Sequence, residues 1–306
     1  MRLDRMVTLC VTRPLITAGL GASERTLPVL MYHSISDDPE AGVSAYYKIA
    51  TNRDVFAMHI RRLGERGYQS ADLAEGCRLL NTKVPTTSKP VVITFDDGFR
   101  DFYDQAFPIL KKYGQTAVMY LPTAFIAGDR RSFKGRECMT WNEVRELHEQ
   151  GVHFGSHTVS HPKLYELSWK EIEQELARSK EHLERELGVE ITSFAYPFAF
   201  PQQDQRFTDK FTQMLRQLGY RNCATTAVGR VRPGDDLFCV KRLPVNSCDD
   251  QALFDAKLAG AYDWFAHPQN FVKRANSWLG RTRRNGSPSA SSKTSSTAIA
   301  AQDSTR

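Results

Sequence analysis

The sequence predicts an α/β protein folded as a deformed, TIM-barrel-like (β/α) barrel. Between residues 27 and 265, short apolar or β-branched runs alternate at least six times with amphipathic helical segments. Such alternation is typical of parallel strands joined by right-handed crossover helices. A doubly wound open sheet fits the same alternation. Because no GxGxxG motif follows a strand, we prefer the barrel.

The predicted strands are short apolar runs, and several of them end in polar residues. A run that is apolar at every position indicates a strand buried on both faces. A short strand or turn is also expected around residues 68–70. The predicted strands cover residues 27–35, 91–94, 116–121, 152–157, 193–198, 220–225 and 240–245.

The predicted helices are bounded by residues that favour helix ends. Asp54 is expected to be an N-cap, and Thr140 and Ser168 each begin a capping-box pattern with a glutamate three positions later. A long loop over residues 123–139 is expected to line a binding site. The predicted helices cover residues 55–66, 73–80, 103–113, 141–150, 169–187, 209–218 and 250–265.

Composition divides the chain of 306 residues into three parts. Residues 1–26 combine basic residues with short apolar stretches and are interpreted as a leader or a flexible arm. Residues 27–270 are predicted to form the folded domain. Residues 271–306 are rich in Ser, Thr and Ala and have few large apolar residues, so they are predicted to be a basic, mostly disordered tail.

The positive charge of the chain lies in that tail. From Val272 onward, seven basic side chains face one acidic side chain, Asp303, which gives +6 (7 − 1), equal to the net charge of the whole chain, +6. The folded domain is therefore near neutral, and no nucleic-acid partner is expected. A basic tail is usually solvated. Contact with an anionic glycan, a membrane surface or nucleic acid is the less common alternative.

Cysteine usage and hydropathy bear on the compartment. The six cysteines form no CxxC pair, which favours reduced thiols. No apolar run reaches the length of about 18 residues that a transmembrane helix needs. The sequence therefore predicts a cytoplasmic or membrane-peripheral protein, or a periplasmic or secreted one if the start codon is mis-set.

Two adjacent carboxylates, Asp96 and Asp97, follow the apolar and β-branched strand predicted at residues 91–94. Adjacent residues of a strand point to opposite faces, so the two carboxylates can take different roles. Gly98 then permits a sharp exit from the strand. Taken alone, this stretch fits an ordinary Asp-Asp-Gly turn equally well.

Two histidines, His157 and His161, follow the strand predicted at residues 152–157. Their imidazoles can reach one metal ion if the loop curls, and neutral imidazoles suit zinc or a similar divalent ion. An H-x₃-H pair alone is more often an incidental feature of a surface loop. Because all strand ends of a parallel barrel meet on one face, Asp97, His157 and His161 are predicted to form a three-ligand metal site. Asp96 is then free to act as a general base toward water.

These two stretches resemble a known family. Residues 94–98 (TFDDG) and 156–162 (SHTVSHP) are similar to the first two motifs of the polysaccharide deacetylases, which are carbohydrate esterase family 4 or NodB homology domains. Residues 30–35 and 194–198 also resemble segments of many members, and the resemblance covers roughly residues 27–250. It implies a deformed (β/α) barrel that removes N-acetyl groups from amino sugars of a glycan, using a divalent metal, commonly zinc.

The resemblance assigns the motif residues to roles. Asp97, His157 and His161 match the metal ligands, and Asp96 matches the general base. A backbone N–H near Tyr196 would stabilise the oxyanion of the reaction, although ordinary packing at a strand end accounts for Tyr196 equally well.

Two further roles are less firmly placed by the resemblance. The usual third-motif arginine that steadies the base is not evident, so Arg242 is the candidate, with an exposed strand-edge charge as its alternative. The late Leu-x-His motif of many relatives is also absent. His33 is preferred to His267 as the general acid because it ends the first predicted strand. His33 could instead be a structural residue or a substrate contact.

Two rival functions accompany this interpretation. One is a related metal-dependent amidase that acts on a small non-glycan C–N bond. The other is a non-catalytic carbohydrate-binding relative, which the intact set of Asp96, Asp97, His157 and His161 argues against. The glycan itself stays open among exopolysaccharide, peptidoglycan, chitin oligomers and lipid-linked sugars.

Overall fold

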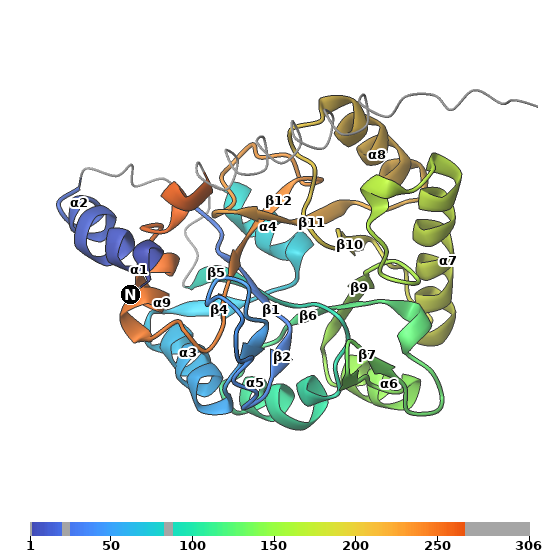
Figure 1. The fold of residues 1–306 in the computed structure, drawn as a ribbon, viewed down its shortest axis with the longest axis horizontal. Coiled ribbons are helices and arrows are strands. Elements are labelled where there is room, and N and C mark those ends of the chain that lie inside the picture. Colours follow the sequence, from blue (N-terminus) through green and yellow to red (C-terminus); the bar gives the residue numbers. More distant parts are fainter. Residues whose placement is uncertain (1, 20–24, 83–87, 267–306) are drawn as a thin grey trace, which may run out of the picture.

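The centre of the computed structural model is a closed ring of seven parallel strands (Figure 1). The structure describes residues 2–19, 25–82 and 88–266. The ring closes because β1 pairs with both β12 and β5, and β4 (Tyr68–Ser70) extends the sheet outside the ring. The predicted barrel is therefore confirmed. In ring order, the strands are β1 (Val29–Tyr32), β12 (Val240–Pro244), β11 (Asn222–Val228), β10 (Ser193–Ala195), β9 (His153–Ser156), β6 (Val118–Leu121) and β5 (Lys89–Phe95).

Helices surround this ring (Figure 1). Both predicted capping boxes are confirmed, at Thr140 and Ser168. The predicted N-cap Asp54 is wrong, because the side chain of Asn52 accepts hydrogen bonds from the backbone N–H groups of Asp54 and Val55. The surrounding helices are α3 (Arg53–Glu65), α4 (Leu73–Asn81), α5 (Phe107–Lys112), α6 (Trp141–Glu149), α7 (Trp169–Leu187), α8 (Gln205–Gln217) and α9 (Gln251–Leu258).

The long loop predicted over residues 123–139 contains a small hairpin. Its strands β7 (Ser132–Phe133) and β8 (Arg136–Glu137) are joined by Lys134 and Gly135, whose φ angles are 50° and 77°. Two consecutive positive φ angles are typical of a tight type I′ turn, in which a lysine is unusual. A guanidinium N–H of Arg136 donates to Ser34 Oγ at 3.0 Å, which fastens the hairpin to strand β2 (Ser34–Ile35), itself paired with β3 (Ala50–Thr51).

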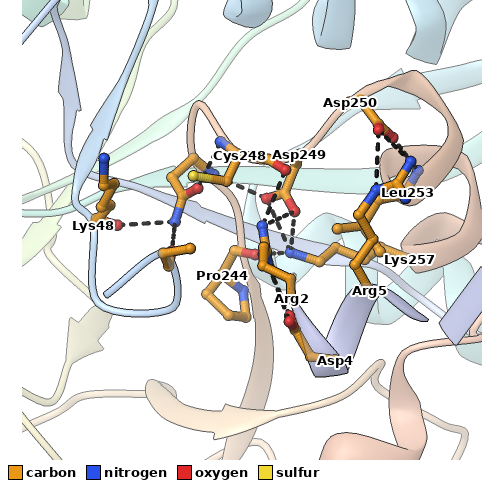
Figure 2. A network of polar contacts seen from close by, with 12 residues as sticks. Arg2, Asp4, Arg5, Lys48, Pro244, Cys248, Asp249, Asp250, Leu253 and Lys257 are labelled. Carbon is orange, nitrogen blue, oxygen red and sulfur yellow. Dashed lines mark hydrogen bonds and ion pairs between the residues drawn. The ribbon is translucent and has the colours of Figure 1, made fainter. Parts of the chain in front are cut away.

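The N-terminal segment predicted as a leader or flexible arm is helical and lies beside α9 (Figure 1). It consists of α1 (Leu3–Val7), the π-helical turn η1 (Thr8–Thr12) and α2 (Arg13–Thr17). Arg2 donates to the carbonyl of Cys248 at 3.0 Å, and Arg5 pairs with Asp250 at 2.6 Å (Figure 2). The predicted tail, residues 271–306, lies outside the described residues. None of the described helices combines the length and apolar character that spanning a bilayer requires.

A buried histidine on α3 links this helix to the barrel and to α9. The ring of His59 stacks on Phe254 with centroids 4.2 Å apart. His59 Nε2 lies 2.7 Å from the carbonyl oxygen of Asp249, so it carries the proton and donates. Nδ1 then accepts from the hydroxyl of Tyr32 at 3.1 Å. Burial lowers the pKa of His59 to about 4 from an ordinary value of 6.5, although Asp249 opposes the shift.

This buried histidine makes stability depend on pH. Because the pKa of His59 is lower in the folded state, the unfolded chain binds more protons between pH 6.5 and 4, and stability falls as the pH falls through this window. From pH 7 to pH 5, we expect His59 to contribute a loss of about 2 kcal/mol in the free energy of unfolding. Urea unfolding at both pH values, compared between the wild type and His59→Gln, measures this contribution. An equal loss in both proteins would contradict it.

Candidate active site

The polar residues singled out from the sequence meet at the carboxyl ends of the barrel strands. Asp96 and Asp97 follow β5, and His157 follows β9. His33 follows β1 directly, and Arg242 lies within β12. The parallel ring therefore gathers side chains that are more than 200 residues apart in the sequence, as expected for a (β/α) barrel.

Asp97, His157 and His161 form a compact buried cluster. Asp97 Oδ1 lies 3.3 Å from His161 Nε2 and 3.7 Å from His157 Nε2. The three candidate ligand atoms lie within 4.8 Å of one another, and this is the one such group found in the part of the chain that the structure describes. Asp97 Oδ1 is buried and has no hydrogen-bond partner. A buried carboxylate oxygen without a partner, facing two imidazoles, fits a divalent cation.

Hydrogen bonding fixes how His157 presents its ring. Its Nδ1 lies 2.8 Å from the carbonyl oxygen of Ala195, and because a carbonyl can only accept, Nδ1 carries the proton. Nε2 then presents a lone pair toward Asp97, which is the arrangement that metal-binding histidines use. Burial lowers the pKa of His157 to about 4, although Asp96 raises it, so the imidazole is neutral near pH 7.

The backbone is strained on both sides of this cluster. Asp97, Thr158 and His161 have φ angles of 74°, 70° and 56°, a region that non-glycine residues seldom occupy. The side chain of Thr158 supports the turn by accepting a hydrogen bond from the N–H of His161 at 3.0 Å. At Gly98, where φ is 67°, a Cβ atom would lie 2.7 Å from the side chain of Leu121. Such strain tends to accumulate at functional sites, where the surrounding structure holds it.

Asp96 belongs to a separate ion pair with Arg242. Arg242 NH1 donates to Oδ1 at 2.7 Å and NH2 donates to Oδ2 at 2.8 Å. Arg242 Nε also donates to the carbonyl of Thr225 at 2.9 Å, so the guanidinium is fixed in orientation. Burial raises the pKa of Asp96, but the charge and hydrogen bonds of Arg242, together with His157 and His33, hold the pKa below its ordinary value. The alternative of an exposed strand-edge charge for Arg242 is wrong, because its side chain is fully buried.

His33 lies at the open side of this pair. Its Nε2 is 3.8 Å from Asp96 Oδ2, which is too long for a hydrogen bond, and its side chain is 21% exposed. Burial lowers the pKa of His33, and Asp96 and Asp97 partly oppose the shift. The rival histidine, His267, lies outside the described residues.

Tyr196 does not offer its own N–H to the site. This N–H donates to the carbonyl of Ala224 at 2.9 Å as part of the strand ladder. The ring packs edge-on against Phe200 and Phe211, with centroids 5.0 and 5.3 Å away. The packing interpretation of Tyr196 therefore agrees with its contacts. An oxyanion donor elsewhere in this segment stays a prediction.

One residue at the site was not identified from the sequence. Lys134, at the tip of the β7–β8 hairpin, places Nζ 3.1 Å from Asp97 Oδ2, the carboxylate oxygen that faces away from His161. The ammonium also lies over the rings of Phe133 and Phe198, at 4.6 and 5.5 Å from their centroids. The Lys-Gly pair was a signal for a tight turn. Nothing in the sequence indicates that this turn folds back over Asp97.

Comparisons with known proteins agree with this geometry. The family model described as polysaccharide deacetylase matches residues 83–223. The Bacillus subtilis protein YxkH, named provisionally as a polysaccharide deacetylase, is 29% identical over 230 residues, which is 75% of each chain. The poly-β-1,6-N-acetyl-D-glucosamine N-deacetylase of Escherichia coli is 31% identical over 140 residues, or 42% of this chain. The match spans only 20% of the length of that enzyme.

A solved structure extends the likeness to most of the barrel. The Streptococcus pyogenes deacetylase PplD, determined in complex with acetate, superposes with a TM-score of 0.65 at 27% identity. The superposition covers 77% of this chain and 99% of PplD. The family model, the curated relatives and this solved structure therefore all show that the chain is similar to the polysaccharide deacetylases.

Proposed function

We propose that this protein is a metal-dependent hydrolase that removes N-acetyl groups from the amino sugars of a poly- or oligosaccharide. The observation that carries the proposal is that two adjacent carboxylates lie in different environments. Asp97 faces two histidines without a hydrogen bond on Oδ1, whereas Asp96 is held by Arg242 beside this cluster. A metal site with an adjacent ionised base is an arrangement that can hydrolyse an acetamide.

Asp97, His157 and His161 would hold the metal, for which zinc is the first candidate because one carboxylate and two imidazoles suit it. A divalent cation bound there would supply Lewis-acid chemistry, polarising the acetamide carbonyl and lowering the pKa of water. Lys134 donates to the outer oxygen of Asp97, which leaves Oδ1 as the oxygen directed toward the histidines.

Asp96 would act as the general base. Arg242 keeps its carboxylate ionised and fixes both oxygens, so the base is ready to take a proton from the attacking water. His33 is neutral near pH 7, since burial lowers its pKa. To act as the general acid, His33 must therefore gain a proton before it gives one to the leaving amine. Asp96 lies 3.8 Å away and would hold the proton that it took from the attacking water, so it is the candidate donor to His33.

The entrance to the site favours a sugar ring. Phe198 is 45% exposed, and the centroid of its ring lies 4.6 Å from that of His161. The ring of Phe133 packs against the same histidine. An exposed aromatic ring such as Phe198 beside a catalytic centre can contact a pyranose. The name of the E. coli relative supports an N-acetylglucosamine polymer as the first substrate to test. The compartment stays as predicted from the sequence.

Variants of Asp96 and Asp97 should behave differently when both the bound metal and the acetate release are measured. Asp96→Asn should lower acetate release from N-acetylglucosamine oligomers at least about a hundredfold while retaining the metal, because it loses only the base. Asp97→Asn should lose both metal and activity. Asp129→Asn, at an exposed side chain, is the matched control and should change neither.

Three outcomes would count against this assignment. Full activity of Asp96→Asn would rule out its role as the base. Retention of the metal by Asp97→Asn would remove Asp97 from the ligand set. Absence of acetate release from every N-acetylated glycan, with metal bound, would contradict the proposed function, and cleavage of a small non-glycan amide would then favour the rival amidase.

Replacing the partner of the base tests the Asp96–Arg242 pair. Arg242→Met leaves Asp96 buried without a counter-charge, so the pKa of Asp96 should rise and the acid limb of the kcat/KM profile should move to higher pH. We also expect a loss of about 3–5 kcal/mol in the free energy of unfolding. Arg145→Met, at a partly exposed arginine, is the control. An acid limb that does not move would contradict a catalytic role for the pair.

A further inference from the structure

The loop that carries the two histidines is held largely by side chains. Residues 157–161 lie outside helices and strands. Two N–H groups of this loop donate to side chains nearby in the sequence, that of Thr158 to Ser156 Oγ at 3.3 Å and that of His161 to Thr158 Oγ1 at 3.0 Å. Thr158 and His161 also have positive φ angles of 70° and 56°. Because such strained conformations persist only where the surroundings hold them, the loop needs support from outside.

This support comes from Glu175 on α7. Its Oε2 accepts the N–H groups of Val159 and Ser160 at 2.8 and 2.9 Å, and its Oε1 accepts the hydroxyl of Ser160 at 2.8 Å. One carboxylate therefore fixes the two peptide N–H groups that directly precede His161. Ser160 is exposed, so water can satisfy its N–H in the absence of Glu175, but water does not fix its position.

A second contact from the same side of α7 holds the start of the loop. Ser179 comes four residues after Glu175, a spacing that places both side chains on one face of the helix. The hydroxyls of Ser179 and Ser156 are 2.8 Å apart, and both residues are fully buried. Ser156 is the last residue of β9, against which α7 packs (Figure 1). The helix thus contacts the loop next to His157 and again next to His161.

The two histidines differ in what orients their rings. His157 Nδ1 lies 2.8 Å from the carbonyl oxygen of Ala195. His161 Nδ1 is buried and has no hydrogen-bond partner among the described residues. Metal-binding histidines usually donate this second nitrogen to a neighbouring group, and that bond orients the ring. The direction of His161 toward Asp97 therefore depends more strongly on the position of its backbone.

We propose that Glu175 is a positioning residue, which holds the loop so that His161 can share a metal ion with Asp97 and His157. This inference rests on the metal site of the proposed function. Without Glu175 the strained loop relaxes, and His161 Nε2 no longer keeps its distance of 3.3 Å from Asp97 Oδ1. The barrel itself does not depend on this carboxylate. The buried apolar side chains that anchor α7 to the core are those of Ile172, Leu176 and Leu183.

Zinc affinity, measured on the full chain by competition with a chromophoric chelator, tests this inference. Glu175→Leu should weaken zinc binding at least about tenfold, because two N–H groups of the loop lose their acceptor. Glu175→Gln loses the charge but keeps the reach, so it should bind zinc as the wild type does. Glu175→Asp keeps the charge but has a shorter side chain, so it should also bind more weakly. Glu173→Leu, at an exposed position of the same helix, is the matched control and should change nothing.

Unfolding midpoints of the metal-free proteins separate a local effect from a loss of folding, and they should agree among all variants. Glu175→Leu with the zinc affinity of the wild type would overturn this inference alone, as would Glu175→Gln that binds as weakly as Glu175→Leu. If Glu175→Leu does not fold, Glu175→Asp with unchanged affinity overturns it instead. Wild-type protein that binds zinc but releases no acetate would contradict the proposed function and leave this inference intact. Wild-type protein that binds no zinc would overturn both.

Discussion

The buried ion pair between Asp96 and Arg242 is the interaction on which the site depends. Both charges are almost fully withdrawn from water, a state that is tolerable only because the guanidinium meets both carboxylate oxygens. The pair joins the end of β5 to β12, with β1 between them in the ring. Asp96 still donates its N–H to the carbonyl of Tyr32, so it remains part of the strand ladder.

Asp96 is still part of the strand ladder, and the chain turns away from the strand at the next residue, Asp97. The chain must leave the strand immediately afterwards, and Asp97 does so at a φ of 74°. The carboxylate of Asp97 then lies against the two histidines, while that of Asp96 lies against Arg242. Two adjacent residues of the same type therefore acquire different environments. Their chemical difference arises from the backbone and from their partners, not from the side chains themselves.

The parts of the site that lie at strand ends could be predicted from the sequence. Asp97, His157 and His161 each follow the end of a barrel strand, and a parallel barrel brings such ends together. The helix starts at Thr140 and Ser168 were predictable for a similar reason, because a capping box is a local pattern. The choice of Asp54 over Asn52 failed because neighbouring residues of similar capping tendency compete.

Contacts that depend on the folding of loops could not be predicted. Lys134 reaches Asp97 because a two-residue turn with positive φ angles is held over the site by Arg136 and Phe133, far from Asp97 in sequence. The N–H of Tyr196 was a plausible donor until its pairing with the carbonyl of Ala224 was known. The helical order of the N-terminal segment likewise rests on contacts with residues near the other end of the chain, such as Asp250. Local sequence patterns carry little information on such distant partners.

We propose that Asp97 holds a metal with the two histidines while Asp96 remains outside its coordination shell. Anomalous diffraction at the zinc edge, from crystals grown with zinc, tests this arrangement. We expect one ion at about 2.0–2.2 Å from a carboxylate oxygen of Asp97 and from Nε2 of His157 and His161, with Asp96 still paired to Arg242. An ion coordinated by Asp96, or no ion among these three side chains, would contradict it.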